Sequence, residues 1–78
     1  MFSNDDLWNA IDILAKNNHM SPSGLARASG LDPTTFNKSK RKSKYGQPRW
    51  LSFDTLAKVL KQTNTTLTEF ANYIENPI

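Results

Sequence analysis

The most conspicuous chemical feature of this 78-residue chain is a run of positive charge near its middle. Residues 21–50 contain seven lysines and arginines against one acid, a net charge of +6, whereas residues 1–20 and 51–78 have net charges of −2 and −1. Such a concentration favours a polyanion, because each neutralised phosphate releases condensed counterions. It fits DNA, RNA or anionic lipid, and it also fits a solvated loop without a partner. Six of these cations lie within twelve residues: Lys38, Lys40, Arg41, Lys42, Lys44 and Arg49.

The residue types that most enzymes need are scarce. The chain has no cysteine and its only histidine is His19, which leaves no thiolate nucleophile and no zinc-ligand cluster. It has no glycine-rich phosphate loop, and the side chains of the neighbours Ser39 and Lys40 would diverge on a helix. We therefore expect no enzyme activity, no metal and no cofactor. The acidic N-terminus and the lack of a long apolar run predict a cytoplasmic protein without a membrane span.

Capping residues and apolar spacing predict an all-α fold of five helices in one domain, residues 1–78. Apolar residues recur at helical spacing along residues 7–14. A serine or an aspartate stands directly before a proline at residues 21–22 and 32–33, the arrangement of a cap followed by proline at the first helical position. Ser52 is a further cap, and residues 66–69 read T-x-x-E, a capping box. The helices are expected at residues 4–18, 22–29, 33–40, 53–63 and 67–75.

The large apolar residues are expected to serve mainly the core. Trp50 is expected to anchor the loop at residues 40–50 to that core, and stacking of Tyr45 or Trp50 on an unpaired base is the alternative. Leu67 is placed on the apolar side of the last helix. The aromatic residues assigned to the core are Trp8, Phe36, Phe53 and Phe70.

The connection between the second and third expected helices is the informative motif. A helix-turn-helix needs a small residue where its helices cross, a glycine at the turn and an apolar residue on the inner face of the second helix. Ala26, Gly30 and Phe36 have the types and spacing for these roles, with Leu25 and Leu31 beside them. An ordinary helical hairpin in a small bundle is the alternative, but it does not explain the adjacent basic run.

With this motif the chain resembles the DNA-binding domains of lambda-type phage repressors and the related xenobiotic-response-element family. It is similar above all to N-terminal domains that precede a LexA-like self-cleaving peptidase domain. The resemblance implies a five-helix, lambda-repressor-like fold and the operator-reading part of a bacterial or phage transcriptional regulator, a repressor. The segments that carry it are GLARASGL at 24–31, DPTTFNK at 32–38, PRWL at 48–51 and LAKVL at 56–60.

Three positions depart from the family pattern. Ser29 and Ser39 stand where larger apolar residues usually pack, which predicts a shorter or looser third helix. Pro22 replaces a polar side chain that touches DNA in some repressors, so a base contact from the second helix is not expected.

A recognition helix beginning at Pro33 would assign DNA contacts to named residues. If Phe36 faces inward, four side chains project outward toward the major groove and are candidates for base contacts: Thr34, Asn37, Lys38 and Arg41. Thr34 suits a thymine methyl group, Asn37 suits adenine and Lys38 suits guanine. Contacts to the DNA backbone are expected from Ser21, Ser23, Lys40, Lys42, Lys44 and Arg49.

The expected partner is double-stranded DNA, bound without chemical change to it. Proteins of this kind bind as two-fold pairs, so a homodimer is expected either on DNA or through a C-terminal domain beyond this segment, with half-sites about 34 Å apart. The alternative function is a non-specific nucleic-acid-binding or protein-interaction helical module. Steep salt dependence and a preference for duplexes favour the first interpretation, whereas a preference for single strands favours the second.

Overall fold

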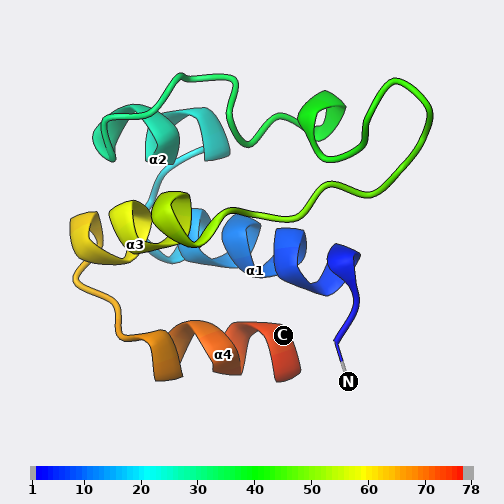
Figure 1. Cartoon of the computed structure of the whole chain (residues 1–78). Coiled ribbons are helices and arrows are strands. Elements are labelled where there is room, and N and C mark those ends of the chain that lie inside the picture. The colour runs from blue at the N-terminus through cyan, green and yellow to red at the C-terminus, as the bar shows by residue number, and fades with distance from the viewer. Residues whose placement is uncertain (1, 77–78) are drawn as a thin grey trace.

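The computed structural model describes residues 2–76 as four α-helices and one short 3-10 helix (Figure 1). Within these residues no β-strand forms, and a single isolated bridge pairs Lys42 with Pro48. The all-helical prediction is therefore confirmed for this part of the chain. The five-helix count is wrong, because residues 33–40 do not form an α-helix. The elements are α1 (Asn4–Asn17), α2 (Pro22–Ala28), the 3-10 helix (Lys38–Lys40), α3 (Phe53–Gln62) and α4 (Leu67–Glu75).

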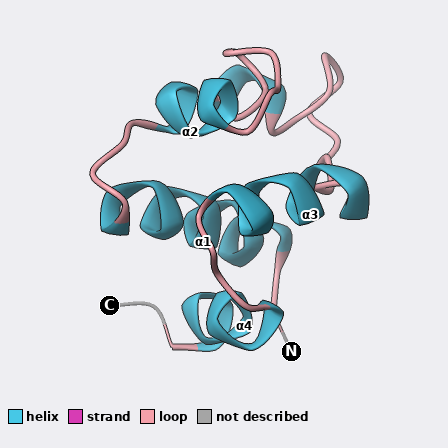
Figure 2. Ribbon diagram, turned by 90° about the vertical axis from the view of Figure 1, so that its left-hand side faces the viewer, coloured by secondary structure: helices cyan, strands magenta, loops and turns pink. Residues whose placement is uncertain are grey.

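The helices lie in three layers (Figures 1 and 2). Helix α1 lies in the middle layer beside α3, with α2 on one side and α4 on the other, and it packs against both α2 and α4. The segment between α2 and α3 runs along the α2 side and ends in a loop that protrudes from the helical body (Figure 1). No helix in residues 2–76 is long and apolar enough to cross a membrane.

A hydroxyl side chain caps the start of each α-helix. Such a cap accepts a hydrogen bond from one of the backbone amides that have no partner at a helix N-terminus. The capping box expected at Thr66 and Glu69 is confirmed, and α1 has a second one, formed by Ser3 and Asp6. The Oγ atoms accept from the third helical amide at 3.2 Å in Ser3, 3.1 Å in Ser21, 3.1 Å in Ser52 and 3.0 Å in Thr66.

The core lies between α1 and the elements on either side of it. Three of the four aromatic residues expected there, Trp8, Phe36 and Phe70, are buried. The expectation for Phe53 is wrong, since its side chain is 72% exposed, and Leu67 is exposed as well. Both are the first residue of their helix, at an end that neighbouring elements do not cover. The remaining buried residues are Leu7, Ala10, Ile11, Leu14, Ala15, Leu25, Ala26 and Val59.

Candidate nucleic-acid interface

Helix α2 ends in the turn that a helix-turn-helix requires. The backbone N–H of Gly30 donates to the Arg27 carbonyl at 3.0 Å, and that of Leu31 donates to the Ala26 carbonyl at 2.9 Å. These two bonds form a Schellman motif, which needs a left-handed residue directly after the helix cap. Gly30 meets that need with a φ of 75°. The expected role of Gly30 at the turn is thus confirmed. Ala26 is fully buried, but the crossing of two helices predicted there does not form, because residues 33–40 are not an α-helix.

The segment after this turn differs from the expected recognition helix. Residues 33–36 form consecutive tight turns, in which Thr35 N–H bonds to the Asp32 carbonyl and Asn37 N–H to the Thr34 carbonyl, both at 3.0 Å. Asn37 is then extended, with φ −62° and ψ 146°, before the 3-10 helix begins. The chain direction reverses as predicted, but the expected α-helix is replaced by turns.

Side chains donate hydrogen bonds to backbone carbonyls that would accept from backbone amides in an α-helix. The Thr35 hydroxyl donates to the Asp32 carbonyl at 2.6 Å, an oxygen that would accept from the Phe36 amide in an α-helix. Two consecutive β-branched threonines also have low helix propensity. At the far end, the Phe36 carbonyl accepts from the Arg41 guanidinium, at 3.0 Å from Nη2. Ser29 and Ser39 predicted a shorter or looser third helix. In the structure the change is larger, and no α-helix forms at residues 33–40.

Three of the four candidates for base contacts are exposed in this segment. Asn37 and Lys38 are exposed at the start of the 3-10 helix, and Thr34 is exposed in the preceding turn. The Thr34 hydroxyl donates to Asp32 Oδ1 at 2.6 Å, and the Thr34 backbone N–H donates to the same oxygen at 2.8 Å. These two bonds favour the carboxylate and lower the pKa of Asp32 from its ordinary value. Asp32 therefore caps a turn and not a helix.

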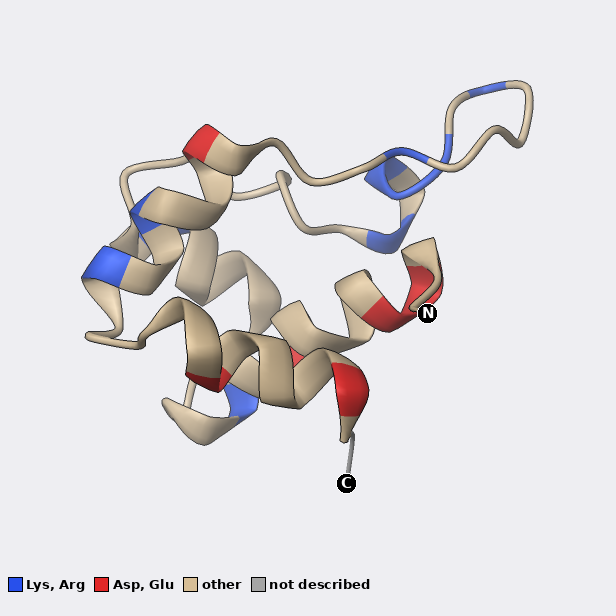
Figure 3. Cartoon of the chain, turned by 60° about the horizontal axis from the view of Figure 1, so that its bottom comes forward, with Lys and Arg blue, Asp and Glu red and all other residues tan. Residues whose placement is uncertain are grey.

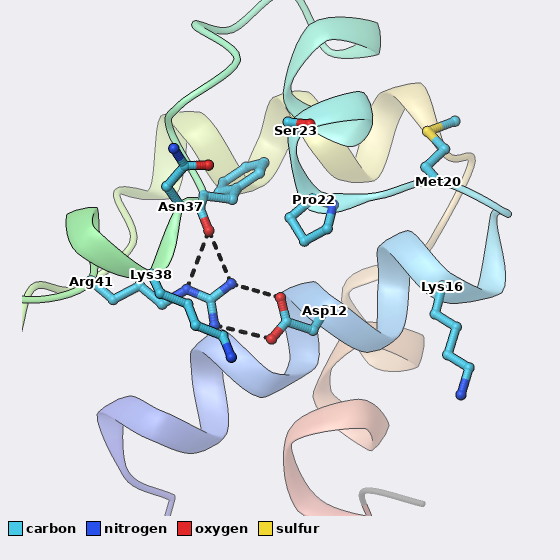
Figure 4. A pocket seen from close by; sticks show the side chains of 9 residues that line it. Asp12, Lys16, Met20, Pro22, Ser23, Asn37, Lys38 and Arg41 are labelled. Carbon is cyan, nitrogen blue, oxygen red and sulfur yellow. Dashed lines mark hydrogen bonds and ion pairs between the residues drawn. The ribbon is translucent and has the colours of Figure 1, made fainter.

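The fourth candidate, Arg41, does not project outward as predicted. Its guanidinium makes a bidentate ion pair with Asp12 of α1, with N–O distances of 2.6 and 3.0 Å (Figure 4). It also donates to the Phe36 carbonyl and lies 5.3 Å from the centre of the Trp8 ring. Only 14% of the Arg41 side chain is exposed. The prediction erred because sequence spacing placed Arg41 on a helix face, whereas the turns bring it back over α1.

An open groove of about 450 Å³ separates α1 and α2 from the segment at residues 36–41 (Figure 4). Lys16 and Met20 lie at one end of it and the Asp12–Arg41 pair at the other, as Figure 4 shows. The groove brings one candidate for a backbone contact, Ser23, close to three of the four candidates for base contacts. These three lining residues are Asn37, Lys38 and Arg41.

The candidates for backbone contacts lie around this groove and along the protruding loop. Ser21 caps α2 and its Oγ lies 3.2 Å from Ser23 Oγ, so both hydroxyls stand at the start of that helix. Figure 3 shows lysine and arginine stretches along the segment that leads into and out of the loop. No acidic residue occurs between positions 33 and 53. The four basic candidates are all exposed: Lys40, Lys42, Lys44 and Arg49.

The attachment of the loop to α1 was not predicted from the sequence. The Arg49 carbonyl accepts a hydrogen bond from Trp8 Nε1 at 2.9 Å and another from the Asn4 side-chain amide. The Arg49 N–H donates to the Arg41 carbonyl at 3.0 Å. One available signal was the position of Asp12 four residues after Trp8, on the face of α1 where the indole is buried. A carboxylate there predicts a cationic partner from another element.

Trp50 does not anchor the loop to the core as expected. Its side chain is 60% exposed and meets Phe2 edge to face, with 6.3 Å between the ring centres. The buried indole at this point is Trp8, which bonds to the chain one residue earlier, at Arg49. The aromatic anchor is thus supplied by α1 and not by the loop.

Comparison with known proteins agrees with this geometry. The family of the Cro/C1-type HTH DNA-binding domain matches residues 10–76. No curated protein and no solved structure matches the chain. The family match covers most of the chain, including the capped α2, the glycine turn and the basic segment after it. The chain belongs to the Cro/C1-type helix-turn-helix DNA-binding domain family.

Proposed function

We propose that this domain reads an operator in duplex DNA as part of a bacterial or phage transcriptional repressor. The observation that carries the proposal is the exposed segment after the Gly30 turn, which is entirely free of acidic residues from position 33 to position 53. It follows α2 at the place where a helix-turn-helix protein presents its reading element to the major groove.

Three exposed side chains are proposed to contact bases. Asn37 pairs with adenine and Lys38 with the acceptors of guanine. Thr34 uses its methyl group against a thymine methyl, since its hydroxyl hydrogen is donated to Asp32. Arg41 reads a base only if it leaves Asp12 and the Phe36 carbonyl, so we propose that it positions the segment.

The backbone contacts supply affinity without sequence choice. Phosphates are proposed to meet two groups of residues, the hydroxyls at the start of α2 and the exposed cations around the loop. Two copies of the chain are proposed to occupy half-sites about 34 Å apart, paired on the DNA or through a separate domain. The phosphate-contacting residues are Ser21, Ser23, Lys40, Lys42, Lys44 and Arg49.

Selection of duplexes from a random pool, at two salt concentrations, tests the proposal. An enriched motif, especially one with two-fold symmetry, is the expected result. Salt-sensitive binding without any motif would contradict operator reading and identify a non-specific nucleic-acid binder. A preference for single strands would contradict the duplex partner.

Two single variants separate base reading from phosphate binding. Lys38→Ala is expected to change the enriched motif, because one base contact is worth about 1–3 kcal/mol of discrimination. Lys42→Ala is expected to weaken all duplexes equally and to lower the salt slope by about one unit. Lys61→Ala on α3 removes the same charge outside the proposed interface and serves as the matched control. An unchanged motif with Lys38→Ala removes that residue from the reading set.

A further inference from the structure

The protruding loop is a small hairpin-like turn, closed by the bridge between Lys42 and Pro48 and held by backbone and side-chain hydrogen bonds. Ser43 N–H donates to the Gln47 carbonyl at 2.8 Å, and Gly46 N–H donates to the Ser43 carbonyl at 2.9 Å. The Ser43 hydroxyl accepts from the amides of Tyr45 and Gln47. Gly46 is left-handed, with a φ of 78°, as the last position of a three-residue hairpin loop requires. The hairpin, residues 42–48, therefore presents its tip in one conformation.

Both arms of this hairpin are attached to α1 at their base. The incoming arm starts at Arg41, whose side chain is paired with Asp12. The outgoing arm ends at Arg49, whose carbonyl is bonded to Trp8. Because the Arg41 side chain also donates to the Phe36 carbonyl, next to Asn37, these bonds hold the hairpin beside the proposed major-groove site. The tip points away from the helical body (Figure 1).

The chemistry of the tip suits nucleic acid. Tyr45 is 78% exposed, and Lys44 Nζ lies 5.0 Å from the centre of its ring. An exposed aromatic ring beside a lysine contributes nothing to the core. The pair of Lys44 and Tyr45 suits the surface of a nucleic acid. The ammonium group would contact a phosphate, and the aromatic ring would pack on a base or on the apolar face of a sugar.

The reach of the hairpin is compatible with the groove spacing of B-DNA. From Lys38 to Arg41 the chain rises about 2 Å per residue, and two extended residues to Ser43 add about 3.3 Å each, while Lys44 and Tyr45 lie in the turn and add less than that. The tip therefore lies no more than about 19 Å from Lys38. Successive grooves of the duplex are half a helical turn apart, about 17 Å. A protein that places Lys38 in the major groove can bring Tyr45 to the neighbouring minor groove.

We propose that the hairpin at residues 42–48 is a second DNA-contacting element, which enters the minor groove about half a turn from the major-groove site. Lys44 favours a narrow A·T-rich groove, whose negative potential is enhanced, and Tyr45 packs against its wall. The inference rests on the proposed function, because it takes the position of Lys38 in the major groove as its reference. A minor-groove contact by the hairpin would add a preference for A·T pairs beside the core motif, which the residues after α2 do not contact.

Inosine substitution in the flank tests this proposal. An I·C pair presents the major-groove pattern of G·C but lacks the minor-groove amino group, so its minor groove matches A·T. The duplexes keep the selected motif and carry A·T, G·C or I·C pairs about five base pairs, half a turn, from the Lys38 contact. The wild-type domain is expected to bind the A·T and I·C flanks equally and the G·C flank about tenfold more weakly.

The double variant Lys44→Ala/Tyr45→Ala is expected to bind all three flanks equally, and more weakly than the wild type because a phosphate-contacting cation is lost, while keeping the selected core motif. Both side chains are exposed, so this variant keeps the fold, which its thermal unfolding checks. Lys61→Ala is the matched charge control and retains the flank preference. Gly46→Ala, which strains the hairpin turn, is expected to weaken the preference without removing a cation.

The possible failures are distinguishable. If the core motif is selected but the three flanks bind alike, the hairpin proposal is overturned and the operator-reading proposal stands. If the I·C flank behaves like the G·C flank, the flank is read from the major groove and the minor-groove assignment is wrong. If no duplex is bound in a sequence-dependent way, both proposals fall.

Discussion

Helix α1 and the segment from Pro33 to Trp50 are held in place by different interactions. Helix α1 has 14 residues and buries six of them, whereas the longer segment buries only Phe36. The backbone of α1 is satisfied by its own hydrogen-bond ladder, while the segment relies on side chains of Asp32, Thr35 and Arg41 to satisfy its turns. A helix of this kind tolerates most surface changes. The segment depends on a few polar contacts, each of which a single substitution removes.

The same difference suits the proposed functions of the two regions. The core around α1 provides a fixed support, and the segment keeps most of its polar side chains exposed. Loops on a rigid scaffold often carry binding residues for this reason.

The largest expected effect comes from removing the one buried side chain of the segment. Phe36→Ala is expected to lower the free energy of unfolding by about 3–5 kcal/mol, through lost burial and the cavity left beside Trp8. Phe53→Ala is the matched control and is expected to change it by less than about 0.5 kcal/mol, because Phe53 is exposed. Urea unfolding measures both. Equal losses would mean that the segment is not anchored through Phe36.

If Phe36→Ala does not fold, Phe36→Leu tests the same anchoring role. It keeps most of the apolar volume and is therefore a milder change. It is expected to destabilise the domain measurably, whereas Phe53→Leu is expected to have no effect. A Phe36→Leu variant as stable as the wild type would contradict the anchoring role.

The next effect comes from separating the segment from α1. Asp12→Asn and Arg41→Met are each expected to cost about 1–3 kcal/mol, between the values for exposed and for buried ion pairs, since the pair is partly exposed. The double variant is expected to cost less than the two single losses together, because it leaves no unpaired charge. The exposed pair Asp54–Lys58 on α3 is the control, expected to couple by less than about 0.5 kcal/mol. Strict additivity at Asp12 and Arg41 would disprove the contact.

A smaller effect is expected at the joint between the two regions. Gly30→Ala is expected to destabilise the domain by about 1 kcal/mol, because an alanine pays a penalty in the left-handed conformation. Gly30→Asn is expected to cost less, since asparagine tolerates that conformation. Thermal unfolding of the two variants provides the comparison. An alanine variant as stable as the wild type would contradict the left-handed turn.

The smallest effect is a pH dependence confined to the turn. The hydrogen bonds from Thr34 lower the pKa of Asp32 below its ordinary value of 3.8, so they stabilise the turn above that pH. This stabilisation is lost as the pH falls through the lowered pKa. The amide resonance of Thr34 is expected to report the change, and Asp32→Asn is expected to abolish it. An unaltered acid titration in Asp32→Asn would assign the effect to another carboxyl group.

The sequence predicted features that depend on a few neighbouring residues. The cap-proline pair at Ser21, the capping box at Thr66 and the Gly30 turn were all identified, because each is specified within about four positions. The burial of Phe36 and Phe70 followed from apolar spacing. These local rules were sufficient for the four α-helices and for the helix-turn connection.

The features that were missed depend on side-chain hydrogen bonds that rules of helix capping and apolar spacing do not describe. Residues 33–40 have a cap and a proline that favour a helix, but Thr35 takes the Asp32 carbonyl and Arg41 takes the Phe36 carbonyl. The Arg41 contact to Asp12 joins positions 29 residues apart, which no local pattern reveals. The hairpin was not predicted because the residues on either side of its three-residue loop do not alternate between apolar and polar. Its one signal was Gly46 after a short polar run.

The two tryptophans give the chain a built-in optical probe of its two regions. Trp8 is buried with its indole N–H bonded to Arg49, whereas Trp50 is exposed near the surface ring of Phe2. A buried indole emits at shorter wavelength than one in water, and iodide quenches the exposed indole first. Detachment of the hairpin base from α1 would remove the hydrogen bond from the Trp8 indole and would thus change the emission of the buried component, without any added label.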